Sequence, residues 1–273
     1  MNWTTEQLLT LTKEALALTH STLSELGKNA KDEREGKFVG DIVTSGDVAI
    51  SEKLIQFFKE KGVPAIIWSE ESEIIKLTED PQFIISFDDI DGTDNFFRGE
   101  NALPYCTILS IFDNTQPTFN DALVAGILVH NTNDIWHAVR GEGTYLNDKS
   151  VFTSKKTTLG REERALLVVD HHGSGGVISP LFKHYIDFWV KDFGCTGMHL
   201  AGISSGMFDV FVNASIKSYE VGAGYLLITE AGGLITDFEG NELKNKQYEF
   251  NKTYQFIAAG NKELLKEILE KLH

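Results

Sequence analysis

The chain has 273 residues, an apolar content of 42% and a formal net charge of −15 at pH 7, so it can bury a sizeable core without disulfides. Two cysteines are too few for a disulfide framework, and we expect a reducing, cytoplasmic setting. The acidic balance argues against nucleic acid as a partner, and no apolar run reaches the roughly 20 residues that crossing a membrane requires.

Helix and strand patterns alternate along the first half, which favours a layered α/β fold. The first helix is predicted to begin after Thr4, with Gln7 as its capping-box partner. The second helix should follow Ser45 and end near Gly62. Apolar runs predict strands at residues 65–68, 83–87, 105–112, 122–130 and 134–140, with a turn at 141–147.

The pattern changes after about residue 150. A strand at 165–169 is predicted to lead into a glycine-rich turn at 173–176 and a helix. We further predict helices at 196–206, 218–231 and 262–272 and strands at 208–212 and 256–259. The chain is therefore predicted to have two halves, residues 1–150 and 151–273, and because no linker separates them we expect them to share an interface.

Two of the predicted strands end abruptly in acids, at Ser69-Glu70-Glu71-Ser72 and at Asp88-Asp89-Ile90-Asp91-Gly92-Thr93-Asp94-Asn95. Because α/β proteins bind ligands at the carboxyl ends of strands, we expect these carboxylates and the Ile90 carbonyl to converge in a turn that Gly92 permits. Hard oxygen ligands suit Mg²⁺ rather than zinc, and a two-ion site could form. The alternative interpretation is a solvated turn, because Asp and Gly are common in turns.

The same segment carries a possible anion site. Thr93 and Asp94 are predicted to open a short helix, whose first amides, those of Gly92 and Thr93, could hold phosphate oxygens. One loop would then supply both metal ligands and phosphate contacts. Hydrolysis of a phosphate ester needs this combination.

Four segments, in order along the chain, are similar to signatures of the inositol monophosphatase family. Residues 88–96 resemble Asp-Pro-Ile-Asp-Gly-Thr-Thr-Asn-Phe, and residues 69–72 resemble Gly-Glu-Glu-Ser. Residues 40–47 resemble a segment with Asp-Leu-Val-Thr-x-x-Asp, and residues 219–233 resemble Trp-Asp-x-Ala-Ala-Gly through Glu-Ala-Gly-Gly. One such match would be weak evidence, but four in order are specific.

This resemblance implies an αβαβα layered sandwich of the sugar phosphatase type and Mg²⁺-dependent hydrolysis of a small sugar or polyol phosphate, with two or three ions per site and a homodimer. Glu70, Asp88 and the Ile90 carbonyl would bind the first ion. Asp88, Asp91 and Glu220 would bind the second, and Glu70 can reach a third. Residues 1–150 would carry most metal ligands, and residues 151–273 would complete the second metal site and the substrate site.

The resemblance also implies roles around the substrate. Asp47 and Thr93 would position the attacking water, with Glu70 beside them as a catalytic residue. The amides of Gly92 and Thr93 would hold the phosphate. Three consecutive residues would lie beside the ring of the substrate: Gly194, Cys195 and Thr196.

Departures from the family pattern leave the substrate and the second ion open. Glu220 stands where the family has aspartate, so the second site would be shifted or weaker, or Glu220 would only complement a helix start. Asp89 and Asp94 replace proline and threonine and add charge that would repel an anion, for which Arg98 either compensates or is a surface cation. Alternative activities are those of a fructose-1,6-bisphosphatase or a 3'(2'),5'-bisphosphate nucleotidase. A non-enzymatic alternative is a metal- or ligand-binding member with weakened catalysis.

One further motif is rejected. Residues 202–206, Gly-Ile-Ser-Ser-Gly, match the nucleophile elbow of hydrolases. That elbow requires a preceding strand and a later histidine, whereas residues 196–206 have a helical pattern and the only later histidine is His273.

Overall fold

A computed structural model describes residues 3–34, 42–99, 102–170, 178–184 and 187–273. Its helices are α1 (Thr5–Leu26), α2 (Ser45–Lys61), α3 (Thr93–Gly99), α4 (Ser179–Phe182), α5 (Thr196–Ser204), α6 (Ser218–Glu230) and α7 (Lys262–Leu272). Short 3-10 helices occupy Gly27–Lys31 and Phe119–Asp121. Gly40 and Asp41 of the first motif and the predicted turn at 173–176 lie outside the described residues.

The strands form two main sheets. Those of the larger are β3 (Ala65–Ser69), β4 (Ile75–Lys76), β5 (Phe83–Asp91), β6 (Cys106–Phe112), β7 (Ala122–Val129), β8 (Asp134–Val139), β9 (Gly143–Leu146) and β10 (Lys149–Val151), in the order β10-β9-β8-β7-β6-β5-β3-β4. Those of the smaller are β11 (Leu166–Val169), β12 (Trp189–Lys191), β13 (Val210–Lys217), β14 (Leu234–Thr236) and β15 (Thr253–Ala259), in the order β12-β11-β13-β15-β14. A separate pair joins β1 (Glu33–Arg34) to β2 (Val43–Thr44).

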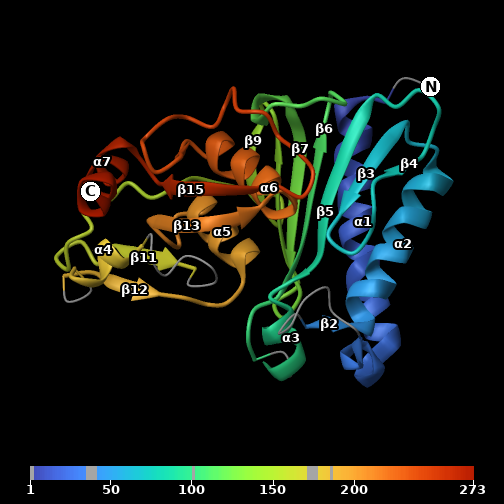
Figure 1. The fold of residues 1–273 in the computed structure, drawn as a ribbon, viewed down its shortest axis with the longest axis horizontal. Coiled ribbons are helices and arrows are strands. Elements are labelled where there is room, and N and C mark those ends of the chain that lie inside the picture. Colours follow the sequence, from blue (N-terminus) through green and yellow to red (C-terminus); the bar gives the residue numbers. More distant parts are fainter. Residues whose placement is uncertain (1–2, 35–41, 100–101, 171–177, 185–186) are drawn as a thin grey trace.

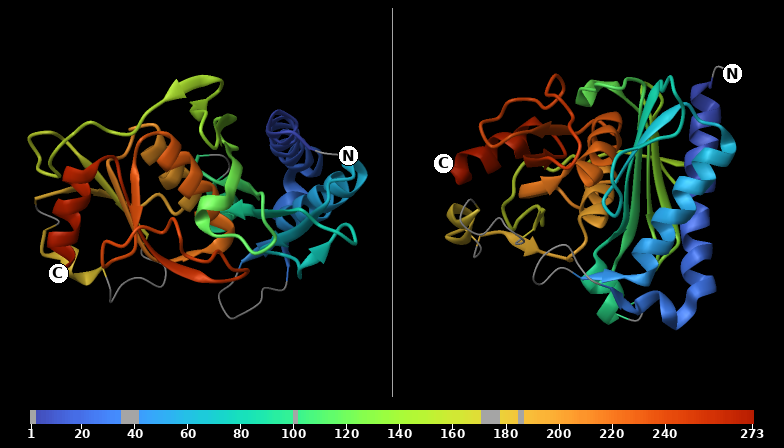
Figure 2. Two further views of the ribbon diagram at one scale, coloured as in Figure 1. Left: turned by 90° about the horizontal axis from the view of Figure 1, so that it is seen from above. Right: turned by 45° about the vertical axis from the view of Figure 1, so that its right-hand side comes forward.

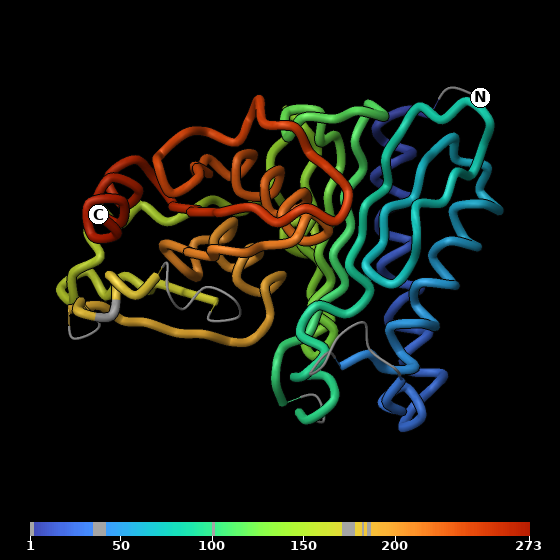
Figure 3. The backbone as a smooth tube through the Cα atoms, viewed as in Figure 1, coloured from blue at the N-terminus to red at the C-terminus, as the bar shows by residue number. Residues whose placement is uncertain are grey.

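The sheets and helices stack in layers (Figure 1). Helices α1 and α2 pack on one face of the larger sheet, and α5 and α6 lie between the two sheets (Figure 2). Helix α7 packs against β15 and β13 and contacts α4, so α1 and α7 stand at opposite ends of the molecule (Figure 3). This order confirms the predicted αβαβα sandwich. Three buried apolar clusters fill the interfaces between these layers.

Two helix starts follow from capping. The Thr4 hydroxyl accepts the N–H of Gln7 at 3.2 Å and the Gln7 side chain accepts the N–H of Thr4 at 2.9 Å, which confirms the predicted capping box. At α2 the capping residue is Thr44, whose hydroxyl accepts from Asp47 while the Asp47 carboxylate accepts the N–H of Thr44. Among the helices of the described ranges, none combines the length and apolar character that a bilayer crossing requires.

The prediction of a turn at residues 88–91 was wrong, because these residues continue β5. Asp88 pairs with Ile108 and Asp91 pairs with Cys106, so two residues on β5 stand against one on β6 between those pairs. This is a β-bulge. In a regular strand, residues three apart point to opposite faces. The extra residue in the bulge shifts this alternation by one position, so the side chains of Asp88 and Asp91 can point to the same side of the sheet.

The turn predicted at 141–147 was also wrong. Residues of β9 pair with both β8 and β10, so this segment is the middle strand of a hairpin series rather than a loop. Gly141 and Gly143, with φ of 81° and 88°, supply the tight reversal before it. The reversal therefore ends at Glu142, five residues before the predicted end at Asn147, and Gly143 is the first residue of β9.

Candidate metal centre

Strand register brings the first two predicted acids together. Strands β3 and β5 run parallel, and Ser69 pairs with Phe87. The next residues of the two strands, Glu70 and Asp88, therefore stand side by side at the same edge of the sheet. Helix α6 packs against β5 and carries Glu220 in its first turn. Carboxylate oxygens of Asp88, Asp91 and Glu220 all lie within 4.8 Å of one another.

Asp88 lies buried among the other acids of this cluster. Its side chain is buried, and its Oδ1 has no hydrogen-bond partner among the described residues. Burial, followed by the charges of Glu70, Asp91 and Glu220, raises its pKa well above the ordinary value. A buried carboxylate oxygen without a partner is costly. The all-oxygen donor set and the orphaned oxygen fit a hard divalent cation such as Mg²⁺.

Asp91 is held at the N-terminus of α5. Its carboxylate accepts the N–H of Thr196 at 3.1 Å and the N–H of Gly197 at 2.6 Å, and the Cys195 thiol lies 3.0 Å from Oδ2. Burial raises the pKa of Asp91 to about 6, and these three donors oppose that rise. Two residues predicted to lie beside the substrate, Cys195 and Thr196, are thus buried against a predicted metal ligand, and their contact with substrate stays a prediction.

Glu220 combines the two interpretations offered for it. Its Oε2 accepts the N–H of Lys217, the residue before α6, at 2.7 Å and so caps the start of this helix. Burial and then the charge of Asp91 raise its pKa well above the ordinary value. One oxygen therefore serves the helix while the carboxylate also belongs to the acidic cluster, and its role as a metal ligand stays a prediction.

Asp47 and Thr93 come together from different helices. The Thr93 hydroxyl donates to the carbonyl of Ile90 at 2.8 Å and lies 3.4 Å from Oδ1 of Asp47. The backbone N–H and hydroxyl of Thr44 hold Oδ2 of Asp47 at 2.7 and 2.6 Å. Burial raises the pKa of Asp47 to about 6. Because Thr44 holds Oδ2 of Asp47 in place, Oδ1 is directed toward Thr93.

Gly92 permits the chain to leave β5 beside α5. It has a φ of 81°, and a Cβ there would come within 3.0 Å of the carbonyl of Gly194 and 3.3 Å of that of Pro104. The Gly92 carbonyl then accepts the N–H of Phe96 at 3.0 Å, so α3 begins at Thr93 as predicted. Whether the Gly92 and Thr93 amides hold phosphate stays a prediction.

The two acids that depart from the family signature, Asp89 and Asp94, lie in different surroundings. Asp89 is buried, its Oδ2 accepts the hydroxyl of Ser69 at 3.1 Å, and burial raises its pKa well above the ordinary value, which favours its neutral form. Arg98 pairs with exposed Asp94 at 2.8 Å and is itself exposed. Arg98 is therefore a surface cation that offsets the added charge of Asp94 in an i,i+4 pair.

Sequence reasoning missed a neighbouring polar group. Asp170 directly follows β11, and its Oδ2 accepts the side-chain N–H of Asn213 at 3.0 Å and lies 3.5 Å from the Thr196 hydroxyl. An acid after an apolar strand was the signal that identified Asp88, and it could have identified Asp170 as well. The rejected elbow serine, Ser204, lies buried in α5 and donates to the carbonyl of Ala201 at 2.8 Å, which confirms the rejection.

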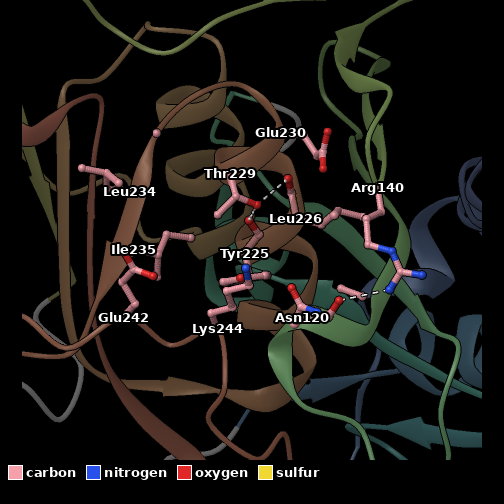
Figure 4. A pocket seen from close by; sticks show the side chains of 12 residues that line it. Asn120, Arg140, Tyr225, Leu226, Thr229, Glu230, Leu234, Ile235, Glu242 and Lys244 are labelled. Carbon is pink, nitrogen blue, oxygen red and sulfur yellow. Dashed lines mark hydrogen bonds between the residues drawn. The ribbon is translucent and has the colours of Figure 1, made fainter.

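A pocket of about 280 Å³ lies at the opposite end of α6 (Figure 4). Figure 4 shows the side chain of Arg140 directed at Asn120. The Arg140 guanidinium donates a hydrogen bond of 3.0 Å to the backbone carbonyl of Asn120. Glu230 accepts two backbone N–H groups from the reversal before β9. At about 1.5 Å rise per residue, this end lies roughly 15 Å from Glu220. The acidic cluster, not this pocket, is therefore the candidate metal centre.

The chain is similar to proteins of one family along its whole length. The profile of the inositol monophosphatase family matches residues 4–273. A fructose-1,6-bisphosphatase/inositol-1-monophosphatase of Methanothermobacter thermautotrophicus is 25% identical over 237 residues, covering 83% of this chain and 81% of the relative. An inositol-1-monophosphatase of Bacillus subtilis is 25% identical over 237 residues, covering 84% and 83%. Nus factor SuhB of Pasteurella multocida is 26% identical over 246 residues, covering 86% and 84%.

Solved structures share the fold. The inositol monophosphatase of Thermotoga maritima has a TM-score of 0.80 at 22% identity, covering 97% of this chain and 96% of that one. An inositol monophosphatase/NADP phosphatase complexed with Mg²⁺ and phosphate has a TM-score of 0.80 at 19% identity, covering 98% and 96%. At these identities the likeness establishes the architecture alone.

Proposed function

This chain belongs to the inositol monophosphatase family, and from that premise we propose that it hydrolyses the phosphate monoester of a small sugar or polyol with the help of Mg²⁺. The observation that carries the proposal is the convergence of Asp88, Asp91 and Glu220 within 4.8 Å, at an edge where Asp88 keeps a buried oxygen without a partner. A chain with a net charge of −15 can bind an anionic substrate there only if cations lie between the two.

The residues would divide the cations between them. Glu70, Asp88 and the Ile90 carbonyl would hold one ion, and Asp88, Asp91 and Glu220 a second, with Glu70 able to reach a third. When bound, Mg²⁺ would neutralise the phosphoryl oxygens and lower the pKa of a coordinated water. Asp88 would contribute to both ions, which accounts for the placement of its carboxylate among four other acids.

Asp47 and Thr93 would orient the attacking water and accept its proton. A hydroxyl has one hydrogen, which can reach the Ile90 carbonyl at 2.8 Å or Asp47 at 3.4 Å. With a cation on the Ile90 carbonyl, Thr93 would donate to Asp47 and its oxygen lone pair would accept a hydrogen bond from the water. Asp47 has a pKa of about 6, which is close to neutral pH and suits a proton acceptor. Thr44 fixes the other carboxylate oxygen, so the acceptor does not have to reorganise.

The substrate within the class is left to experiment. Relatives are named as phosphatases of fructose 1,6-bisphosphate and of inositol 1-phosphate, and one structural neighbour is named as an NADP phosphatase. The alternatives are therefore a fructose-1,6-bisphosphatase and a phosphatase of nucleotides such as a 3'(2'),5'-bisphosphate nucleotidase. Rates of phosphate release on inositol monophosphate, fructose bisphosphate, phosphoadenosine phosphate and NADP at one Mg²⁺ concentration would rank these substrates.

The decisive experiment measures phosphate release with Mg²⁺, after chelation, and in the Asp88→Asn variant. We expect activity to be lost in both of the latter conditions. Asp94→Asn is the matched control, because Asp94 belongs to the same signature but lies exposed in an ion pair with Arg98, and it should keep wild-type activity. Activity that survives both the chelator and Asp88→Asn would overturn the metal mechanism.

A non-catalytic function is the second candidate. Glu220 departs from the family aspartate, and several relatives are named Nus factor SuhB rather than phosphatase. That function predicts calorimetric binding of Mg²⁺ without turnover of any ester in the panel. We also expect a homodimer, as the family resemblance implies, and light scattering after gel filtration would measure it.

A further inference from the structure

Asp91 belongs to a second cluster that contains sulfur. Cys106 on β6 pairs with Asp91 across the sheet, and Cys195 directly precedes α5. The two Sγ atoms lie 3.1 Å apart, and Sγ of Cys195 lies 3.0 Å from Oδ2 of Asp91. A carboxylate oxygen and the two sulfurs all lie within 4.8 Å of one another. The two cysteines come from segments 89 residues apart, so the fold brings them together.

We propose that Asp91, Cys106 and Cys195 form a site for one thiophilic divalent cation of the zinc class, separate from the oxygen-lined cluster. Thiolate sulfur prefers soft and borderline cations, whereas the carboxylates of Asp88 and Glu220 prefer hard ones. Two sulfurs and one oxygen are three ligands of a tetrahedral zinc site, whose fourth position a water can fill. The two sites share a single residue, Asp91.

The geometry requires only a small adjustment. Bonds of about 2.3 Å at a tetrahedral angle place two sulfurs about 3.8 Å apart. The sulfurs of Cys106 and Cys195 would separate by roughly 0.7 Å from their 3.1 Å contact, which side-chain rotation can supply. Each thiol releases its proton to solvent as its sulfur–metal bond forms, so the two thiolates match the charge of the cation and Asp91 leaves the occupied site with one net negative charge. Asp91 is the most exposed of the three ligands, which places the entry on the side of the acidic cluster.

The consequence rests on the proposed function. Asp91 is predicted to bind the second Mg²⁺, and a cation held by the two sulfurs would engage the same carboxylate. Occupation of the sulfur site would therefore withdraw Asp91 from the magnesium cluster and inhibit hydrolysis. Excess Mg²⁺ would relieve the inhibition, because the two cations compete for one ligand.

Cadmium absorption tests the site without any enzyme assay. The chain has two cysteines, so any metal–thiolate charge-transfer band in the ultraviolet arises from Cys106 and Cys195. With a phosphine reductant that does not bind metal, we expect the band to saturate at one Cd²⁺ per chain. Cys106→Ser should weaken Cd²⁺ binding by at least the roughly 10- to 100-fold that loss of an outer-shell partner costs. If the folded wild-type protein gives no band at one equivalent, the proposal is wrong.

The sharing of Asp91 has its own test. Asp91→Asn keeps both thiols, and we expect it to weaken Cd²⁺ binding while the band keeps its thiolate character. Unchanged Cd²⁺ affinity in Asp91→Asn would refute the shared ligand. If Cys106→Ser does not fold, protection of the wild-type thiols from alkylation by one equivalent of Zn²⁺ replaces it, and equal alkylation with and without Zn²⁺ would overturn the site.

Inhibition separates this proposal from the proposed function. Micromolar Zn²⁺ should inhibit the wild-type enzyme in the presence of Mg²⁺ and should inhibit Cys106→Ser much less. An enzyme without phosphatase activity that still shows the cadmium band would contradict the proposed function and support the site. Equal sensitivity of the active wild type and Cys106→Ser to Zn²⁺ would contradict the inhibitory role.

Discussion

Two regions of this molecule bury an aspartate, and they treat it in opposite ways. Asp209 has no exposed surface, and its carboxylate accepts the N–H of Leu166 at 2.6 Å, the ammonium of Lys156 at 3.0 Å and the hydroxyl of Ser154. Asp88 is 4% exposed, has one oxygen without a partner among the described residues, and is surrounded by acids. The carboxylate of Asp209 therefore has its hydrogen-bond partners and a cation, whereas the carboxylate of Asp88 still needs a positive charge beside it.

This difference shows how a structural acid is distinguished from a functional one. Burial alone does not separate them, because both side chains lie in the interior. Satisfaction separates them, since native proteins pair nearly all buried polar groups, and an exception calls for a ligand or a chemical role. Asp209 ties the segment before β11 to β13 and stabilises the fold, whereas Asp88 is costly to the fold until a cation binds.

Removing the charge of Asp88 should produce the largest effect. Asp88→Asn would cost several kcal/mol of transition-state stabilisation, and we expect kcat/KM to fall by about 10³-fold or more. The same variant should be at least as stable as the wild type in a chelator, because it removes one like charge from the cluster. Phosphate release and thermal unfolding of the same samples measure both. A variant that loses activity only because it unfolds would break the comparison.

Asp209→Asn should show the opposite pattern. Leu166 and Lys156 both donate to Oδ2, so the amide oxygen can keep these partners while the amide nitrogen faces Ser154. The variant nevertheless loses the negative charge that strengthens both bonds and pairs with the Lys156 ammonium. We expect the free energy of unfolding to fall by about 2–3 kcal/mol, a value reduced because Lys156 is partly exposed. Urea denaturation measures the loss. The folded fraction should retain wild-type kcat and Mg²⁺ dependence, and a selective loss of Mg²⁺ affinity would contradict the structural role.

Mg²⁺ should stabilise the wild type through the acidic cluster. At 100 times its dissociation constant, a ligand that binds only the folded state adds about 2.7 kcal/mol. We therefore expect the melting temperature to rise with Mg²⁺ in the wild type and in Asp209→Asn. The rise should shrink in Asp88→Asn. An equal rise in all three proteins would mean that Mg²⁺ binds elsewhere.

The pH dependence of stability sharpens the same contrast. The pKa of Asp47 and of Asp91 is about 6 in the folded protein, against an ordinary value of 3.8. Within this window the folded state keeps protons that the unfolded state releases, so the contribution of these groups to stability falls as pH rises from about 4 to about 6. The stabilisation by Mg²⁺ should accordingly be larger at pH 8 than at pH 5. Thermal unfolding with Mg²⁺ and with a chelator at both pH values checks this.

Glu220→Asp should have the smallest effect. It restores the family residue but shortens the side chain that accepts the N–H of Lys217 at 2.7 Å. We expect the Mg²⁺ concentration for half-maximal activity to change by no more than about tenfold, equivalent to about 1.4 kcal/mol. A Mg²⁺ titration of activity measures it. Glu220→Gln is the control, and an activity equal to that of the wild type would remove Glu220 from the metal centre.

The sequence was sufficient for most elements of the fold, because periodicity and capping are local. The start of α1 could be predicted from Thr4 and Gln7 alone. The extension of β5 through Asp88 to Asp91 could not, since a run of acids and glycine has the composition of a turn and only pairing with β6 makes it a strand. The short strands β4, β12 and β14 have two or three residues each, too few for a periodic pattern.

The site was predictable as a set of acids but not as a network. Strand ends and the family resemblance identified Asp88, Asp91 and Glu220 as neighbours. The contacts of Asp91 with α5 depend on tertiary packing between segments more than 100 residues apart, which one sequence does not encode in any local pattern. The proximity of Cys106 to Cys195 was missed for the same reason.

Anomalous diffraction from crystals soaked in Mn²⁺, used as a stand-in for Mg²⁺, tests the central claim most directly. The account predicts a strong peak beside Glu70, Asp88 and the Ile90 carbonyl, with a second peak among the carboxylates of Asp88, Asp91 and Glu220. It also predicts none beside Asp209, whose carboxylate is already satisfied. Strong density elsewhere, with the acidic cluster empty at saturating Mn²⁺, would contradict it.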